Sequence, residues 1–197
     1  MIDVTLFSSP KTRTGRRIGL LGGSFNPAHG GHLHVASTAL KRLGLSEVWF
    51  VIARGNPLKS EHGDYDDRRR SVSRIVDGYN RFDLCNVEAE HKLIYTIDTI
   101  SILQHIHRGD RFVWIMGSDN LASFHHWRAW QEIAGRIPLA VIARPGSRPG
   151  KSVFEQTFAS ARIPERSARR LAALSAPAWV YLKAPFHPVS STALRGE

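Results

Sequence analysis

Residues 22–32 read GGSFNPAHGGH and follow directly on the apolar run Ile18 to Leu21. Gly22 and Gly23 are expected to let the chain leave a buried strand through backbone angles that a side chain forbids, and to let a ligand come close to the backbone. Asn26-Pro27 predicts a rigid turn. A buried strand that ends in such a turn is typical of sites that hold phosphate groups, so a nucleotide is the first hypothesis.

A helix is expected directly after this turn. Apolar residues recur at helical spacing at Leu33, Ala36, Leu40 and Leu43. The helix should therefore begin near Gly30 and direct its free N–H groups and its positive dipole end back at the turn, where an anion can bind. His29 lies just before this helix and His32 in its first turn, so both imidazoles can face one point and donate to phosphate oxygens.

Two other interpretations of this segment are possible. His29 and His32 could be metal ligands, but no Cys or acidic residue nearby in the sequence supplies a third ligand, and a site of two ligands is incomplete. The segment could also be an ordinary glycine-rich loop. It lacks the GxGxxG and GxxxxGK[ST] patterns, which excludes the two commonest phosphate motifs.

Length and composition favour one globular domain spanning residues 1–197, with residues 1–17 as a loose N-terminal leader that lacks the features of a secretory signal. No run approaches the roughly 20 apolar residues that cross a bilayer, so no membrane partner is expected. Cys85 is the only cysteine, which excludes an internal disulfide and suggests a buried structural thiol. These features together favour the cytoplasm; they predict no particular oligomeric state.

The net charge of +10 invites a nucleic-acid hypothesis. The arginines of two basic clusters alternate with apolar positions at helical spacing, and no stacking aromatics lie between them. We therefore expect solvated helix faces and no nucleic-acid partner. The clusters are Arg68, Arg69, Arg70 and Arg74, and Arg166, Arg169 and Arg170.

Short β-branched runs alternate with longer helical patterns, which predicts an α/β fold with a Rossmann-like, doubly wound parallel sheet. Residues 112–116 and 139–143 are continuously apolar, as central strands covered on both faces should be. Ligands should then gather at the carboxyl ends of the strands, near the point where the strand order reverses. The expected strands are Ile18–Leu21, Glu47–Ala53, Leu84–Glu88, Arg111–Met116, Leu139–Ala143 and Val180–Leu182.

Polar residues follow three of these strands. Lys59 lies in the turn after the second strand, where it can reach the anion site or simply be a solvated lysine. Asp119 follows the fourth strand and can be a helix N-cap. Trp127 is either a core residue or, among polar neighbours, a flat platform for a ring. Tyr95-Thr96 precedes a helix expected over 97–106.

At this point the sequence resembles a known group. GSFNPAHGGH is similar to the (G/T)xFDPxHxGH signature of the HxGH nucleotidyltransferase superfamily, with Asn26 where many members carry Asp. Residues 189–195, VSSTALR, resemble its ISSTxIR element. GSDNLASFHHW, at 117–127, resembles the GxDxxxxFxxW element of bacterial nicotinate-nucleotide adenylyltransferases. Tyr95-Thr96 matches their SYT element, with Ile94 in place of Ser, and Pro57 and Lys59 match part of their PxxxPPHK element.

The resemblance implies a nucleotidyltransferase-type Rossmann-like fold and the transfer of AMP from ATP to nicotinate mononucleotide, giving deamido-NAD and pyrophosphate in NAD biosynthesis. The mononucleotide phosphate would attack the α-phosphorus of ATP in line, without an enzyme nucleophile, so catalysis would rest on positioning and charge stabilisation. A Mg²⁺ ion would bridge the ATP phosphates and needs no carboxylate cage.

The resemblance also assigns residues to three roles. The catalytic residues are His29, His32, Lys59 and Arg195. The ATP-binding residues are Gly22, Gly23, Ser24, Phe25, His29, His32, Gly117, Asp119, Ser190, Ser191, Thr192 and Arg195. The residues that bind nicotinate mononucleotide are Asn26, Lys59, Tyr95, Thr96, Trp127 and Arg144.

Three alternatives remain. Phosphopantetheine adenylyltransferases share the first motif, but their chains are usually shorter and lack the GSD…Trp element. A class I synthetase fragment shares the HxGH-like turn, but no tRNA-binding domain follows here. A catalytically inactive nucleotide-binding module would keep the fold without the chemistry; the presence of both imidazoles and the Ser-Ser-Thr run argues against it.

Overall fold

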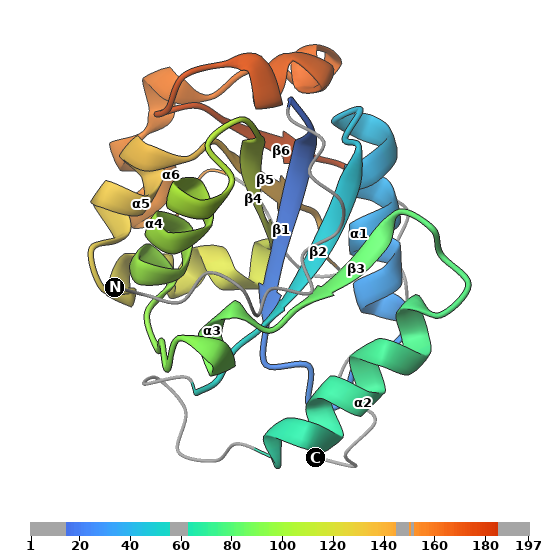
Figure 1. Cartoon of the computed structure of the whole chain (residues 1–197). Coiled ribbons are helices and arrows are strands. Elements are labelled where there is room, and N and C mark those ends of the chain that lie inside the picture. The colour runs from blue at the N-terminus through green and yellow to red at the C-terminus, as the bar shows by residue number, and fades with distance from the viewer. Residues whose placement is uncertain (1–14, 56–62, 145–149, 151, 185–197) are drawn as a thin grey trace.

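The computed structural model describes residues 15–55, 63–144, 150 and 152–184. Within these residues, six strands form one sheet in the order β3-β2-β1-β4-β5-β6, and every neighbouring pair is parallel (Figure 1). This confirms the doubly wound α/β fold. The strands are β1 (Arg17–Gly23), β2 (Glu47–Ile52), β3 (Phe82–Cys85), β4 (Arg111–Gly117), β5 (Leu139–Ile142) and β6 (Trp179–Leu182).

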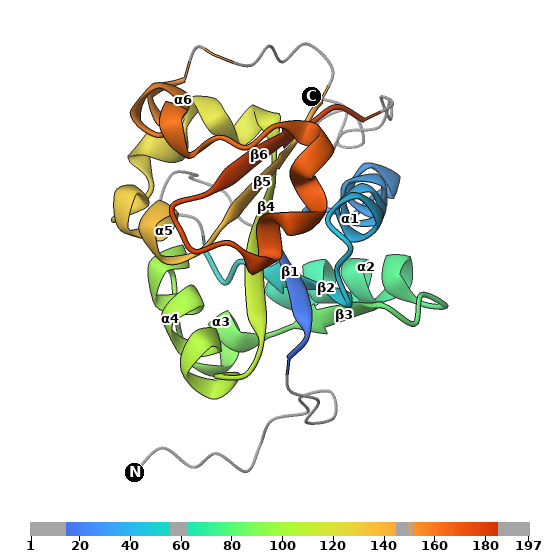
Figure 2. The same cartoon turned by 90° about the horizontal axis from the view of Figure 1, so that it is seen from above.

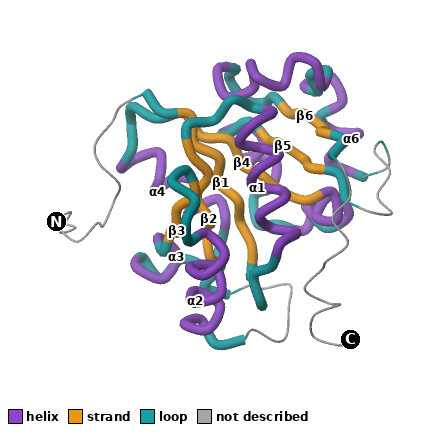
Figure 3. The backbone as a smooth tube through the Cα atoms, turned by 90° about the vertical axis from the view of Figure 1, so that its right-hand side faces the viewer, coloured by secondary structure: helices purple, strands orange, loops and turns teal. Residues whose placement is uncertain are grey.

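Helices cover both faces of the sheet (Figure 2). One face carries α1 (Gly30–Arg42), α2 (Tyr65–Val76) and the 3₁₀ helix η4 (Glu165–Ala173). Figure 3 shows α1 lying along the sheet, where it contacts β1, β2, β4 and β5. The other face carries α3 (Val87–Glu90), η1 (Ser118–Ala122), η2 (Phe124–His126), α4 (Thr96–Ile106), α5 (Trp130–Arg136) and α6 (Val153–Thr157). A short 3₁₀ turn, η3 (Ala159–Ala161), follows α6.

Successive strand residues feed two separate cores. Along β2, Val48, Phe50 and Ile52 pack under α1 and α2, whereas Trp49 and Val51 pack under α3 and α4. Side chains alternate between the two faces of a strand. Because helices cover both faces of this sheet, all residues of a central strand must be apolar. This is why the central strands read as continuous apolar runs. Among the described helices, none is long and apolar enough to cross a membrane.

The expected strand at Leu84–Glu88 is wrong in its second half. The observed strand, β3, is Phe82–Cys85, and residues 87–90 form the short helix α3. The sequence VEAE alternates apolar and polar residues and so looks like a strand, but Val87 and Glu88 are both buried because one helical turn brings them against the core. At the end of β3, burial raises the pKa of the Cys85 thiol to about 12, so it stays protonated at neutral pH.

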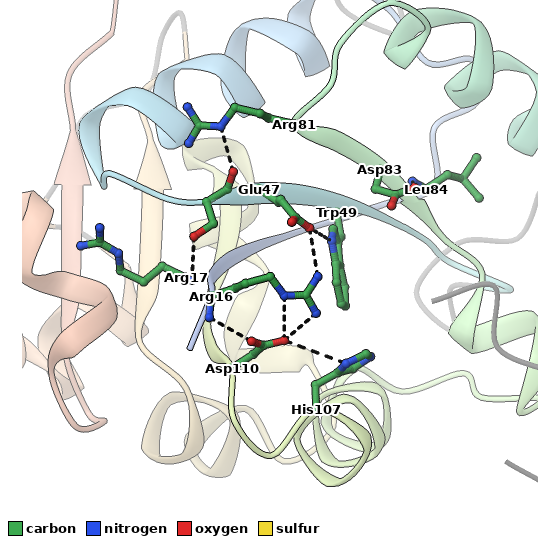
Figure 4. A network of polar contacts seen from close by, with 10 residues as sticks. Arg16, Arg17, Glu47, Trp49, Arg81, Asp83, Leu84, His107 and Asp110 are labelled. Atoms are coloured by element: carbon green, nitrogen blue, oxygen red, sulfur yellow. Dashed lines mark hydrogen bonds and ion pairs between the residues drawn. The ribbon is translucent and has the colours of Figure 1, made fainter. Parts of the chain in front are cut away.

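The amino ends of β1, β2 and β4 are joined by a buried ion-pair network (Figure 4). The Arg16 guanidinium donates from Nη2 to Oδ2 of Asp110 at 2.7 Å and from Nη1 to Oε2 of Glu47 at 3.4 Å. The same Glu47 oxygen accepts from Trp49 Nε1 at 3.0 Å. Residues 15–17, which we had counted in a loose leader, are therefore tied to the sheet; residues 1–14 lie outside the described part of the chain.

Removing one partner of this network should be costly. Asp110→Ala leaves the Arg16 guanidinium, which is only 7% exposed, without its main partner. Breaking a buried pair in this way lowers the free energy of unfolding by about 3–5 kcal/mol. The matched control is Asp66→Ala, whose carboxylate pairs with Arg69 while 63% exposed and should contribute less than about 1 kcal/mol. Urea unfolding of both variants checks this, and equal losses would contradict it.

Candidate active site

The candidate site lies at the carboxyl ends of β1 and β4. These strands are neighbours in the middle of the sheet, yet β1 is followed by α1 on one face and β4 by η1 and η2 on the other. The connections leave in opposite directions, so this is the point where the strand order reverses and where open α/β sheets bind ligands. The structure therefore contains the reversal of strand order near which the sequence predicts that ligands bind.

His29 and His32 cap the start of α1 reciprocally. His29 is the N-cap residue, and its Nδ1 accepts from the backbone N–H of Gly31 at 3.0 Å. Nδ1 of His32 accepts in turn from the backbone N–H of His29 at 3.2 Å. Because Nδ1 is the acceptor in both rings, the proton of each neutral imidazole is assigned to Nε2, which makes Nε2 a donor. The predicted start of α1 at Gly30 is confirmed.

The two imidazoles lie side by side, with their ring centroids 3.9 Å apart. Burial, followed by electrostatic repulsion from His29 and Arg144, lowers the pKa of His32 to about 3. His32 is consequently neutral at physiological pH and can act as a hydrogen-bond donor without carrying a charge. The ring of Phe25, itself buried, meets the His32 ring edge-on at 4.9 Å and helps to fix its orientation.

Contrary to the expectation from the sequence, Gly22 and Gly23 are not needed for unusual backbone angles. Gly22 and Gly23 lie inside β1, and neither has a positive φ. A Cβ on Gly22 would lie 2.5 Å from Cη2 of Trp114, and one on Gly23 would lie 3.1 Å from the Phe25 ring. The glycines therefore make room for two aromatic rings, while the left-handed residue of the turn is Phe25, with φ 49°.

Arg68 is the main functional residue that sequence reasoning missed. We expected it on a solvated face, but it is 2% exposed. Its guanidinium donates to three backbone carbonyls that come from separate parts of the chain, all within 2.9 Å: those of Ser24, Ala53 and Gly63. It thereby fastens the turn before α1 to the loop after β2 and to the start of α2. Arg70, Arg74, Arg166, Arg169 and Arg170 are exposed, and Arg69 is 43% exposed, as expected.

Two further contacts hold the turn, one with α2 and one with Gly63, which precedes that helix. The backbone N–H of Ala28 donates to Ser71 Oγ at 3.0 Å. The side chain of Asn26 lies against Gly63, where a Cβ would come 3.0 Å from its Cγ. The turn at Asn26-Pro27 is thus held by contacts with Ser71 and Gly63.

Asp119 and Arg144 meet at the end of β4. Nη1 of Arg144 lies 3.3 Å from Oδ2 of Asp119, and the backbone N–H of Arg144 donates to Ser118 Oγ at 2.8 Å. Asp119 does not cap η1, whose N-cap residue is Gly117. A Cβ on Gly117 would lie 2.8 Å from Nε of Arg144, so the glycine leaves space for this pair.

Trp127 and the start of α4 lie on the other side of the site. Trp127 is half-buried and packs edge-on against Trp114, with ring centroids 6.3 Å apart. Tyr95 is the N-cap residue of α4 and makes no side-chain capping bond. The guanidinium of Arg128 lies 4.5 Å from the centroid of the Tyr95 ring, which brings the segment after η2 to the helix start. Arg128, the residue after Trp127, therefore contacts the N-cap residue of α4.

Five predicted site residues lie outside the described part of the chain: Lys59, Ser190, Ser191, Thr192 and Arg195. Among the residues that the structure describes, no three His, Cys, Asp or Glu side chains are grouped so as to hold a metal ion.

Comparisons with known proteins agree with this geometry. Residues 20–197 match the family model described as cytidylyltransferase-like. A protein of Roseobacter denitrificans, named "Probable nicotinate-nucleotide adenylyltransferase", is 43% identical over 190 residues, which cover 95% of this chain and 96% of that protein. A protein of a Caulobacter species with the same name is 46% identical over 188 residues, covering 91% and 97%.

Among solved structures, the nicotinic acid mononucleotide adenylyltransferase of Plasmodium falciparum is similar in fold. Its complex with NaAD superposes with a TM-score of 0.72 at 18% identity and covers 92% of this chain and 83% of that one. Its complex with APC gives a TM-score of 0.70 at 17% identity over the same shares of the two chains.

The low pKa of His32 predicts a pH-dependent stability. Between pH 6.5 and about 3 the unfolded chain binds a proton that the folded His32 does not, so the free energy of unfolding falls as the pH falls. His32→Asn keeps an acceptor for the His29 N–H but does not titrate. From pH 7.5 to 4.5 the wild type should lose about 2–3 kcal/mol more than this variant.

Urea unfolding at the two pH values gives this difference. The control is His126→Asn, which changes an exposed histidine of the same sheet edge and should follow the wild type. If His32→Asn also follows the wild type, the imidazole is not held neutral by burial.

Proposed function

Because the chain belongs to the nicotinate-nucleotide adenylyltransferase family, we propose that it transfers AMP from ATP to nicotinate mononucleotide, giving deamido-NAD and pyrophosphate. One observation carries this proposal. The capped start of α1, which suits phosphates, and the start of α4, which suits a carboxylate, lie at the same end of the sheet, and Trp127 packs against Trp114 of β4. From the lone cysteine we also place the reaction in the cytoplasm.

In the proposed mechanism the phosphates bind in front of α1. The N–H groups of the first turn and Nε2 of His29 and His32 donate to phosphate oxygens. The mononucleotide phosphate attacks the α-phosphorus of ATP, and the bond to pyrophosphate breaks in the same displacement. No side chain forms a covalent intermediate, so donors fixed before the substrates bind supply the stabilisation. Arg68 supports this arrangement by holding the turn that carries the histidines.

The remaining roles come from the family resemblance. Lys59, Ser190, Ser191, Thr192 and Arg195 complete the donors to the phosphates. Gly22, Gly23, Ser24, Phe25, Gly117 and Asp119 border the ATP. Asn26, Tyr95, Thr96, Trp127 and Arg144 surround the mononucleotide. The ring of Phe25 is buried, so this residue would contact ATP through its backbone.

The donor set at this site also fits a magnesium ion held mainly by the substrate. His29 and His32 present N–H groups at Nε2 and Arg144 is a cation, so none of them is a ligand for Mg²⁺, which prefers oxygen. Asp119 is the carboxylate that the described residues place at the end of β4. Mg²⁺ would therefore be held by phosphate oxygens, water and at most Asp119. When bound, it neutralises charge that develops on the leaving pyrophosphate.

Removal of the His32 donor should slow the chemical step. His32→Asn is expected to fold and to lower kcat by about 10²–10³, the usual effect of deleting one fixed donor to transition-state charge. His126→Asn is the control and should leave kcat unchanged. Both are measured by pyrophosphate release with ATP and nicotinate mononucleotide; an unchanged kcat in His32→Asn would remove His32 from the mechanism.

The enzyme should prefer nicotinate mononucleotide to the nicotinamide form by a wide margin. The N–H groups at the start of α4 favour a carboxylate, whereas an amide turns its own donors toward them. Trp127 stacks on either ring and adds roughly 1–3 kcal/mol of affinity. Trp127→Ala should thus lower kcat/KM for both mononucleotides and leave their ratio nearly unchanged. Equal wild-type values of kcat/KM would contradict the carboxylate site, and a changed ratio would show that Trp127 discriminates.

A further inference from the structure

Glu88 is a buried acid that the proposed mechanism does not use. It lies in α3 and is 4% exposed. Its carboxylate accepts one hydrogen bond from each of two separate segments. Oε2 accepts from the backbone N–H of Arg54 at 3.1 Å, and Oε1 accepts from the hydroxyl of Thr99 at 2.9 Å. Glu88 therefore connects the loop after β2 to α4.

Stability alone does not explain a carboxylate at this place. Burial raises the pKa of Glu88, and the bonds from Arg54 and Thr99 and the charge of Arg68 offset this only in part. A well-packed neutral side chain would fill the same space without the cost of burying a charge. What the carboxylate provides is two directed acceptors, which fix the distance between the segments that it joins.

One of these segments follows β2, and the other is the first turn of α4, where the proposed carboxylate site lies. Arg54 stands at the start of the loop that leads to Lys59. Thr99 lies one turn into α4, and its hydroxyl is 3.3 Å from the carbonyl oxygen of Tyr95, the N-cap residue of that helix. A shift of the Glu88 carboxylate would therefore move the proposed carboxylate site relative to Arg54, which follows β2.

Arg68 holds the same loop from the opposite side. Its guanidinium donates to the carbonyl of Ala53 at 2.7 Å, and Glu88 accepts from the N–H of the next residue, Arg54. The peptide group between these two residues is thus fixed at its oxygen by a buried cation and at its nitrogen by a buried carboxylate. Only Arg68 also reaches the turn before α1, through Ser24. Glu88 reaches instead the first turn of α4, through Thr99.

We propose that Glu88 is a positioning residue that sets the affinity for nicotinate mononucleotide without touching it, by holding the first turn of α4 at a fixed distance from Arg54 at the end of β2. This inference rests on the function proposed above. It distinguishes Glu88 from a structural residue, because a positional shift on one side of the site changes the binding of one substrate only.

Glu88→Gln tests the inference, since it keeps the shape of the side chain but replaces one acceptor by a donor. The expected result is a KM for nicotinate mononucleotide about tenfold higher, with the KM for ATP unchanged within twofold and kcat within about threefold. The control is Glu90→Gln, the same change at an exposed position of α3, which should match the wild type in all three quantities.

Thr99→Val removes the contact on the α4 side while keeping the Glu88 charge, and should also raise the KM for the mononucleotide selectively. It decides the question if Glu88→Gln does not fold. If the wild type makes deamido-NAD but the variants change both KM values equally, or change neither, the positioning role is overturned. A wild type that makes none would overturn the proposed function instead, so the two failures are distinguishable.

Discussion

The reversal of strand order between β1 and β4 is the constraint on which the rest of the site depends. Parallel strands need crossover connections, and the two that start here go to opposite faces of the sheet. The chain must therefore turn sharply after β1, and the turn ends where α1 begins. His29 and His32 cap this helix with their Nδ1 atoms, which leaves Nε2 as the donor of each ring. In the proposed mechanism, the capping interaction that starts the helix also prepares it for phosphate.

Polar side chains hold the backbone of the loops around this edge. Arg68 binds backbone carbonyls, Glu88 binds a backbone N–H, and Ser71 binds the N–H of Ala28. Loops carry backbone groups that must be paired when they are buried, and a charged side chain can pair several at once. Fixing these loops before the substrates bind is what a reaction without an enzyme nucleophile requires.

The sequence predicts well what depends on local periodicity. The start of α1 at Gly30 and the parallel sheet follow from the spacing of apolar residues along the chain, and the helix start in turn places His29 and His32 at the cap. Arg68 could not be recognised, because in the sequence it looks like its exposed neighbours. The carbonyls that accept its hydrogen bonds lie 44, 15 and 5 residues away in the sequence. The burial of Glu88 could not be recognised either. The alternation of apolar and polar residues at 87–90 fits a half-buried strand, but these residues form one turn of helix.

The central claim is that the start of α1 is a phosphate site formed in advance by the two histidines. A crystal structure with a non-hydrolysable ATP analogue tests it most directly. We predict that the phosphates lie in front of α1, between the ends of β1 and β4, with Nε2 of His32 within hydrogen-bond distance of a phosphate oxygen and the capping bonds of His29 and His32 unchanged. A triphosphate bound elsewhere, or an α1 start that re-forms its cap to bind it, would contradict the claim.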